Sequence, residues 1–259
     1  MQAHNTPVMA KQKGILPLQG TLGNITFYKS KDGYLAREKG GVSAERIATD
    51  PAFQRTRENG AEFGRAGLAG KLLRTSMRAL IASAADSRMV GRLTQAFVKV
   101  IQADATSVRG ERNVIDGEAE MLQGFEFNQN GKLGGTFYPP FTTTIDRVTG
   151  DLTVDIPAFV PINMIAAPSG ATHFNLISGG SAVDFENEVY AAATVENGIL
   201  PIDGTATAAI ALTSNIGAAS TVPLFLVLGI VFYQEINGVK YILRNGSYNA
   251  LAIVDVSGL

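Results

Sequence analysis

The chain has 259 residues, of which 46% are apolar and 17% are charged, so it is long enough and apolar enough to bury a core. It contains no cysteine and only two histidines, which excludes disulfides, thiolate metal sites and a cysteine nucleophile. Residues 1–112 carry a net charge of +9 and residues 113–259 a net charge of −10, which sum to the overall −1. This split predicts two regions with different surfaces.

Residues 1–13 lack the apolar stretch that a signal peptide needs. We therefore expect the chain to be made in the cytoplasm, while its final location is not predicted, and Met9 is an alternative start to Met1. The longest apolar run, residues 222–233, has twelve residues. That is too short to cross a bilayer and is typical of a buried strand, so we expect a soluble chain without membrane insertion.

Residues 1–45 read as an extended arm punctuated by glycines. Short β-like pieces occur at residues 15–18, 24–28 and 34–37, and Lys31-Asp32-Gly33 predicts a hairpin turn between the last two. The arm has too few large apolar residues to form a core alone, so we expect it to lie on another surface.

The arm has the features of an intersubunit element. Its pieces alternate polar and apolar residues, as a strand does when it adds to the sheet edge of a neighbour. Phe27, Tyr28 and Tyr34 are the expected anchors, because aromatic rings contribute strongly to interfaces. The alternative is that the arm folds back on its own chain, since strands pair in cis and in trans by the same physics.

Residues 46–108 are predicted to form a helical hairpin. The first helix is expected over residues 51–83, with Asp50 as N-cap and a proline at the first helical position. The second is expected from Asp86 or Ser87 to about residue 104, because its apolar residues follow a period of 3.6. Four glycines in the first helix suggest that another backbone approaches it closely.

Residues 109–121 read as a connector, and residues 122–259 as a β-domain with turn signals at regular spacing. No helical pattern alternates with its strands, so the predicted class is α+β with an antiparallel, immunoglobulin-like β-sandwich. The expected strands are residues 122–127, 141–145, 152–156, 172–177, 190–194, 206–212, 224–234, 239–243 and 250–256.

Nine basic residues of the helical hairpin form a candidate basic face that could neutralise phosphates. Acidic residues interrupt the pattern and no known nucleic-acid motif appears, so the competing interpretation is that this face meets the acidic half of another copy. The nine residues are Arg55, Arg57, Arg65, Lys71, Arg74, Arg78, Arg88, Arg92 and Lys99.

No pattern predicts catalysis, a metal or a cofactor. Asp146 and Asp151 flank a turn in a spacing that fits no calcium loop, so an ordinary hairpin turn is the better interpretation. His173 has serines near it in sequence, but no nucleophile elbow accompanies them, and a sheet residue is expected there.

Residues 14–41 (GILPLQGTLGNITFYKSKDGYLAREKGG) and 50–73 (DPAFQRTRENGAEFGRAGLAGKLL) resemble an uncharacterised family of Bacteroidota proteins. The resemblance rests on the paired-glycine opening, on Phe27-Tyr28 and on the run at residues 55–59. It implies a Gly-rich arm, a helical segment and a C-terminal immunoglobulin-like domain, and it supplies no catalytic residues.

The arm, the glycine-rich helix and the segregated charge together predict a structural, self-assembling protein, the subunit of a filament, tube or shell. Opposite charges in the two halves suit head-to-tail contacts between copies. The alternatives are a nucleic-acid-binding or packaging protein that uses the basic half, and a surface- or carbohydrate-binding module on the β-sandwich.

Overall fold

The computed structural model describes residues 9–11, 18–38, 40–115, 117–243 and 248–258. It divides into two compact units, Met1–Arg57 and Glu58–Leu259, which we describe separately. The second unit contains both the predicted β-domain and most of the predicted helical hairpin.

The N-terminal unit contains a four-stranded antiparallel sheet with the order β1-β4-β3-β2. The predicted pieces at residues 24–28 and 34–37 fall in β3 and β4, and the turn predicted between them is confirmed. The Ser30 hydroxyl accepts a hydrogen bond from the Asp32 backbone N–H at 3.1 Å and donates one to the Gly33 carbonyl at 3.2 Å. The strands are β1 (Met9–Lys11), β2 (Gly20–Leu22), β3 (Ile25–Ser30) and β4 (Gly33–Glu38).

This sheet has no core of its own. Over residues 18–38 and 40–57, no side chain that the structure describes is buried, and Leu22 is 76% exposed. The composition of the arm predicted this result, because its β-capable pieces carry few large apolar residues. The predicted piece at residues 15–18 lies, apart from Leu18, outside the described residues.

Short helical elements connect this sheet to the long helix α2 (Gln54–Ser76). Ser43 caps α1 (Ala44–Thr49), and Asp50 caps the 3-10 turn η1 (Pro51–Phe53), with its carboxylate accepting the Ala52 N–H at 2.9 Å. The predicted cap at Asp50 is therefore confirmed.

The predicted first helix is broken near its end. At Met77 the backbone turns out of the helical region, with φ −106° and ψ 19°, which separates α2 from α3 (Arg78–Ala84). The second helix, α4 (Met89–Ala103), buries its apolar residues at the predicted 3.6 period. In α2, only Gly70 packs closely, against Leu93 and Phe97, while a Cβ at Gly60, Gly64 or Gly67 would meet nothing within 4 Å.

The large sheet of the second unit is six-stranded, with the order β12-β11-β7-β8 and with β13 and β9 pairing with β11 and β7. The apolar run predicted to be a buried strand forms β11. The strands are β7 (His173–Asp184), β8 (Val189–Glu196), β9 (Leu200–Pro201), β11 (Leu224–Ile236), β12 (Val239–Ile242) and β13 (Ala250–Ser257).

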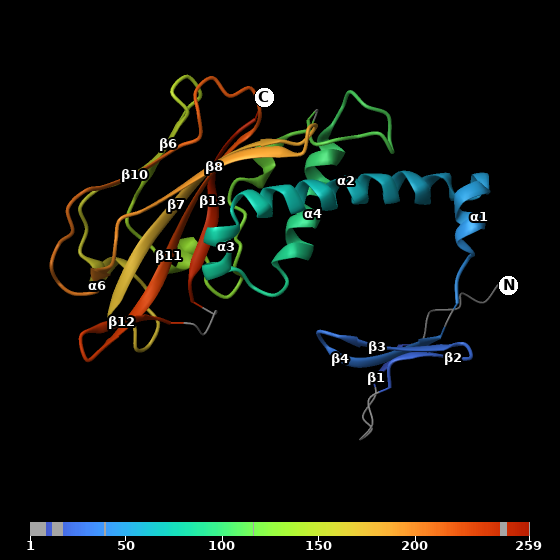
Figure 1. The fold of residues 1–259 in the computed structure, drawn as a ribbon, viewed down its shortest axis with the longest axis horizontal. Helices are drawn as coiled ribbons and strands as arrows, with labels where there is room; N and C mark the ends of the chain where they lie inside the picture. The colour runs from blue at the N-terminus through green and yellow to red at the C-terminus, as the bar shows by residue number, and fades with distance from the viewer. Residues whose placement is uncertain (1–8, 12–17, 39, 116, 244–247, 259) are drawn as a thin grey trace. The chain divides into compact units, whose positions relative to one another are not determined.

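Strands β7 and β11 pair over ten residues and are buried on both faces. One face packs against α2, α3 and α4, and the other against a three-stranded sheet with the order β10-β6-β5 (Figure 1). Burial on both faces explains why β11 is continuously apolar rather than alternating. The small sheet consists of β5 (Thr142–Asp146), β6 (Asp151–Ile156) and β10 (Ile210–Asn215).

The α+β class predicted from the sequence is confirmed, and two antiparallel sheets enclose one of the two apolar cores. The predicted strand at residues 122–127 is absent as such. The 3-10 turn η2 (Ala119–Leu122) ends at the first residue of that range, and the segment after η2 joins β13 through one bridge, Glu126 to Ala252. Its backbone still covers the outer edge of β13, because Phe127 N–H donates to Leu251 and Ile253 N–H to Phe125. Two short helices complete the unit, α5 (Leu133–Thr136) and α6 (Pro161–Met164).

Candidate assembly surfaces

The three predicted aromatic anchors do not share one face of the N-terminal sheet. Tyr34 lies opposite Lys29 in the β3–β4 ladder, and Phe27 is two residues from Lys29 along β3, so these three residues lie on one face. Tyr28 lies on the other face, as does Arg37. The sheet therefore presents an aromatic group on each side.

Each tyrosine of the sheet lies beside a cation. The Lys29 Nζ atom is 5.6 Å from the centroid of the Tyr34 ring, and the Arg37 guanidinium is 5.6 Å from the centroid of the Tyr28 ring. Such contacts contribute about 0.5–1 kcal/mol at exposed sites. Both faces consequently combine a half-buried ring with positive charge, a combination that suits an acidic partner surface.

The pieces predicted to add to a neighbour are already paired with each other as β3 and β4. The edges of the sheet are instead β1 and β2, each three residues long. On the β2 side, β3 is paired through Ile25, Thr26 and Phe27.

Several residues of the predicted basic face hold the fold together. Arg65 donates to the carbonyls of Gly110 and Arg112, at 2.6 and 3.1 Å. Arg92 donates to the carbonyls of Glu126 and Phe127, at 2.6 and 3.2 Å, and pairs with Asp86. These guanidinium groups bind backbone carbonyls and are not available to phosphates.

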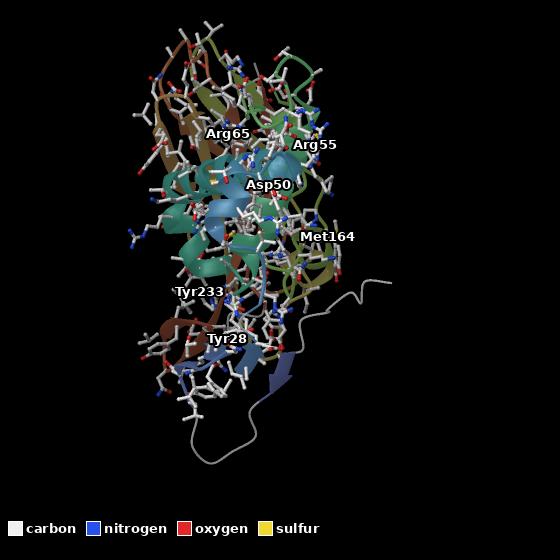
Figure 2. All side chains as sticks on the ribbon, turned by 90° about the vertical axis from the view of Figure 1, so that its right-hand side faces the viewer. Tyr28, Asp50, Arg55, Arg65, Met164 and Tyr233 are labelled. Atoms are coloured by element: carbon white, nitrogen blue, oxygen red, sulfur yellow. The ribbon has the colours of Figure 1, made fainter. Side chains whose placement is uncertain are left out.

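Arg57 and Arg74 also make internal contacts. Arg57 donates to the Ile47 and Asp50 carbonyls, and the Nε of Arg74 donates to Gly70 at 3.1 Å. The exposed members of the predicted basic face are distributed over α2, α3, α4 and the turn before α4, and they are not gathered in one stripe. Figure 2 labels one of them, Arg55, together with the internally bonded Arg65. These exposed residues are Arg55, Lys71, Arg78, Arg88 and Lys99.

The β-domain carries the opposite charge. Between Arg147 and Lys240 the sequence contains no lysine or arginine and eight acidic residues. At the β7–β8 turn Asp184 accepts the backbone N–H groups of Glu186 and Asn187, at 3.0 and 2.9 Å. Hydrogen bonds from Asn187 hold the pKa of the Asp184 carboxyl below its usual value. This turn is therefore anionic at neutral pH.

Strand β8 forms an edge of the large sheet that the sequence did not single out. It pairs with β7 over eight residues, and no described backbone group outside β7 hydrogen-bonds to it. Val189 is 57% and Tyr190 45% exposed. The signal was present, because its sequence VYAAATVE is uncharged until the final glutamate.

A groove of about 420 Å³ lies between α2 and the β7–β8 hairpin. Its apolar lining includes Leu68, Leu72 and Phe185, and Leu68 is 56% exposed. Lys71 and Glu188 bring opposite charges to the same groove. The groove thus combines apolar and charged side chains in one lining, as binding sites commonly do.

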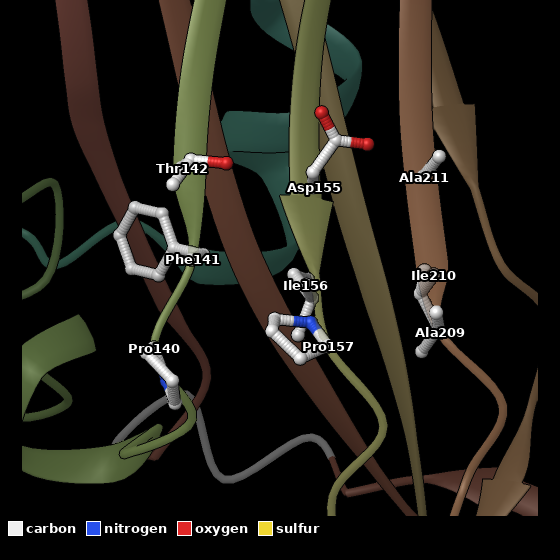
Figure 3. Close-up of a pocket in the computed structure, with 9 residues that line it drawn as sticks. All are labelled: Pro140, Phe141, Thr142, Asp155, Ile156, Pro157, Ala209, Ile210 and Ala211. Carbon is white, nitrogen blue, oxygen red and sulfur yellow. The ribbon is translucent and has the colours of Figure 1, made fainter.

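A second groove, of about 340 Å³, lies across one end of the three-stranded sheet (Figure 3). Phe141, Ile156 and Pro157 form much of its lining. Its polar side chains are Thr142 and Asp155, which lie at the same end of the groove in Figure 3. A sugar requires several convergent polar groups, so this groove gives little support to a carbohydrate site.

The remaining polar candidates take structural positions. His173 begins β7 and lies 3.3 Å from the Glu235 carboxylate, while Ser178 is buried and donates to the Val227 carbonyl. Asp146 accepts the Val148 N–H at 2.8 Å in the β5–β6 turn, as the turn interpretation predicted.

In the described ranges no three His, Asp or Glu side chains gather as a metal site would require. Among the helices described there, none is long and apolar enough to cross a membrane.

Comparison with known proteins gives no family for the chain. No family model matches it, and no curated protein matches it. Among solved structures, the reeler domain of human F-spondin is similar over 46% of this chain and 91% of its own length, at 14% identity and a TM-score of 0.17. A similarity at that level carries no argument about fold or function.

Proposed function

We propose that the chain is a structural subunit that assembles with copies of itself into a filament, tube or shell through its N-terminal sheet. The observation that carries this proposal is that the described part of the N-terminal sheet contains no buried side chain. The proposal assigns no catalytic role to any residue.

The physical argument is one of stability. Ordering a residue costs about 1–2 kcal/mol of backbone entropy, and apolar burial is the main term that offsets this cost. A small sheet needs a hydrophobic face or a packing partner to be stable independently. In the described sheet Leu22 and Ile25 are exposed, and Phe27, Tyr28 and Tyr34 are only half-buried. A second copy would supply the missing apolar contact.

Charge supports association between unlike surfaces. The N-terminal sheet carries Lys29, Lys31 and Arg37 against Asp32 and Glu38, a small positive excess, whereas residues 148–239 carry eight acidic side chains and no lysine or arginine. A positive surface on one copy and a negative surface on the next favour head-to-tail contact. Such contact propagates into a ring or an open polymer, which is the geometry of a tube or filament.

The nucleic-acid alternative has weaker support. Arg57, Arg65 and Arg92 are engaged within the fold, and the exposed cations are dispersed.

We also propose that the two-sheet core is of immunoglobulin-like type and that the chain belongs with the Bacteroidota family it resembles. The apolar core enclosed between the two sheets supports the immunoglobulin-like type. The residues of the N-terminal third support the family.

Removal of residues 1–42 tests the function directly, because it leaves the Ser43 cap of α1 intact. Both apolar cores begin beyond this segment, at Ala66 and Leu133, so the truncated chain is expected to fold. Analytical ultracentrifugation should show large species for the full chain and a folded monomer for the truncated one. Electron microscopy of the full chain should show regular particles. Full-size assembly without residues 1–42 would contradict the proposal.

A further inference from the structure

We propose that the outer edge of β8, with the groove beside it, is the acceptor site for the N-terminal sheet of a second copy. This inference rests on the proposed function and deepens it by naming the surface to which the sheet binds. The donor and acceptor are different surfaces of the same chain, so each copy can give one contact and receive another.

The first argument is the length and composition of the edge. Among the described edge strands, β1 and β2 have three residues each, β12 has four, β5 has five and β10 has six. Strands β8 and β13 each have eight, but the backbone of residues 124–127 covers part of the outer edge of β13. Proteins usually protect a long edge with charges, proline or a bulge. Val189–Val195 contains no charged residue and no proline, and it pairs with β7 in unbroken register. Strand β10 lies near β8, but no described backbone hydrogen bond joins the two strands. The edge backbone groups of β8 therefore remain a template for pairing with another chain.

The second argument is steric. Ala191 and Ala192 are exposed at the middle of β8. Small side chains there let a neighbouring backbone approach to the 4.7–4.9 Å spacing of paired strands. The exposed Val189 and Tyr190 at the start of the strand supply apolar area for the contact.

The third argument is charge. Glu186 and Glu188 are exposed at the turn before β8, and Glu196 is exposed at its end. The N-terminal sheet offers Lys29 and Arg37 beside its tyrosine rings. The acceptor edge is uncharged with acidic residues at its ends, and the donor sheet is aromatic and basic. Opposite charge therefore favours contact between the N-terminal sheet and β8 over contact between two acidic β8 edges.

The fourth argument is the groove. Tyr190 lies opposite Val183, which belongs to the core beneath the helices, so its side chain is on the helical side of β8 and lines the groove. A strand added to β8 would border the groove directly. Its 420 Å³ volume, lined by Leu68, Leu72 and Phe185, suits an aromatic side chain of the incoming sheet.

The test places a lysine on the edge of β8 in the full chain. Ala192→Lys adds a long charged side chain to the middle of the strand, as natural edges do to prevent pairing. Val189→Lys is a second variant at the start of the strand, where the side chain is 57% exposed. Ala211→Lys is the matched control, because Ala211 is an exposed alanine on the edge strand β10. Urea unfolding of each variant confirms that it is folded.

Sedimentation over a concentration series measures association. We expect Ala192→Lys and Val189→Lys to raise the concentration of half-association by at least about tenfold, and Ala211→Lys to leave it unchanged. Mixing Ala192→Lys, which keeps the donor, with the chain lacking residues 1–42, which keeps the acceptor, should give a one-to-one complex that grows no further.

The outcomes separate the two proposals. If both β8 variants associate like the unmodified chain while removal of residues 1–42 abolishes association, the β8 site is wrong and the proposed function stands. If the truncated chain assembles fully, or if the full chain stays monomeric at every concentration, the proposed function fails and the acceptor site fails with it. A loss of association in Ala211→Lys equal to that in Ala192→Lys would also overturn the assignment to β8.

Discussion

Two antiparallel pairs in this chain have the same hydrogen-bond ladder and opposite environments. Strands β3 and β4 pair over six residues without a buried side chain, whereas β7 and β11 pair over ten residues and are buried on both faces. Net hydrogen bonding contributes only about 0.5–1.5 kcal/mol per bond, so the ladder alone does not explain stability. The comparison shows that a sheet in this chain is stabilised by what covers it.

The largest expected effect is on the buried pair. Phe225 on β11 is fully buried beneath the helices and packs against Phe185, with ring centroids 6.2 Å apart. Phe225→Ala should lower the free energy of unfolding by about 3–5 kcal/mol, measured by urea denaturation. The control, Phe27→Ala in β3, should change the same transition by no more than about 0.5 kcal/mol. Equal losses in the two variants would show that the N-terminal sheet shares the core.

A smaller effect is expected where polar groups rather than apolar burial order the chain. Asp104 is 2% exposed as a residue, and its carboxylate accepts the N–H groups of Thr106, Ser107 and Asn113 at 2.8–3.1 Å. Asp104→Asn turns one oxygen into a donor facing another donor, which should cost about 1–3 kcal/mol of unfolding free energy. The measurement is again urea denaturation, and an unchanged midpoint would contradict this account of the loop.

The same carboxylate gives a pH dependence. Burial raises the pKa of Asp104, but hydrogen bonds from Ser107, Thr106 and Asn113 outweigh burial and hold the pKa well below its usual value of 3.8. Because the folded pKa is lower than the unfolded one, the stabilisation is present above about pH 4 and is lost as the pH falls further. The difference in unfolding free energy between the unmodified chain and Asp104→Asn should therefore shrink below pH 4.

The smallest effect concerns the glycines of α2. A Cβ at Gly64 meets nothing within 4 Å, so Gly64→Ala should stabilise the folded chain by up to about 1 kcal/mol. The control is Gly229→Ala in β11, where a Cβ would lie 2.6 Å from the Ala250 carbonyl oxygen and should destabilise by about 1–3 kcal/mol. Thermal unfolding of the two variants distinguishes them. A destabilised Gly64→Ala would show that another backbone packs on this face.

Much of the fold followed from local pattern. The 3.6 period of Met89, Leu93, Phe97 and Val100 predicted α4, and the continuous apolar run predicted β11. The break at Met77 was not predictable, because no proline marks it and the helical period continues through it. The segment at residues 122–127 was predicted as the first strand of the β-domain, but it makes only one bridge to β13.

The candidate surfaces were less predictable. The aromatic residues of the arm could be identified, and strand alternation alone places the neighbours Phe27 and Tyr28 on opposite faces. The face on which Tyr34 lies depends on the β3–β4 register, which the turn at Lys31-Asp32 sets. The basic face was overestimated because sequence does not show that Arg65 and Arg92 donate to carbonyls far along the chain. The edge position of β8 depends on long-range strand order, which local pattern does not contain.

Amide hydrogen exchange at two protein concentrations tests most directly whether a second copy completes the N-terminal sheet. At a concentration where the chain is monomeric, the amides of β3 and β4 should exchange rapidly while those of β7 and β11 stay protected. At a concentration where the chain assembles, the β3 and β4 amides should become protected and those of β7 and β11 should change little. Equal protection of β3 and β4 at both concentrations would contradict the account.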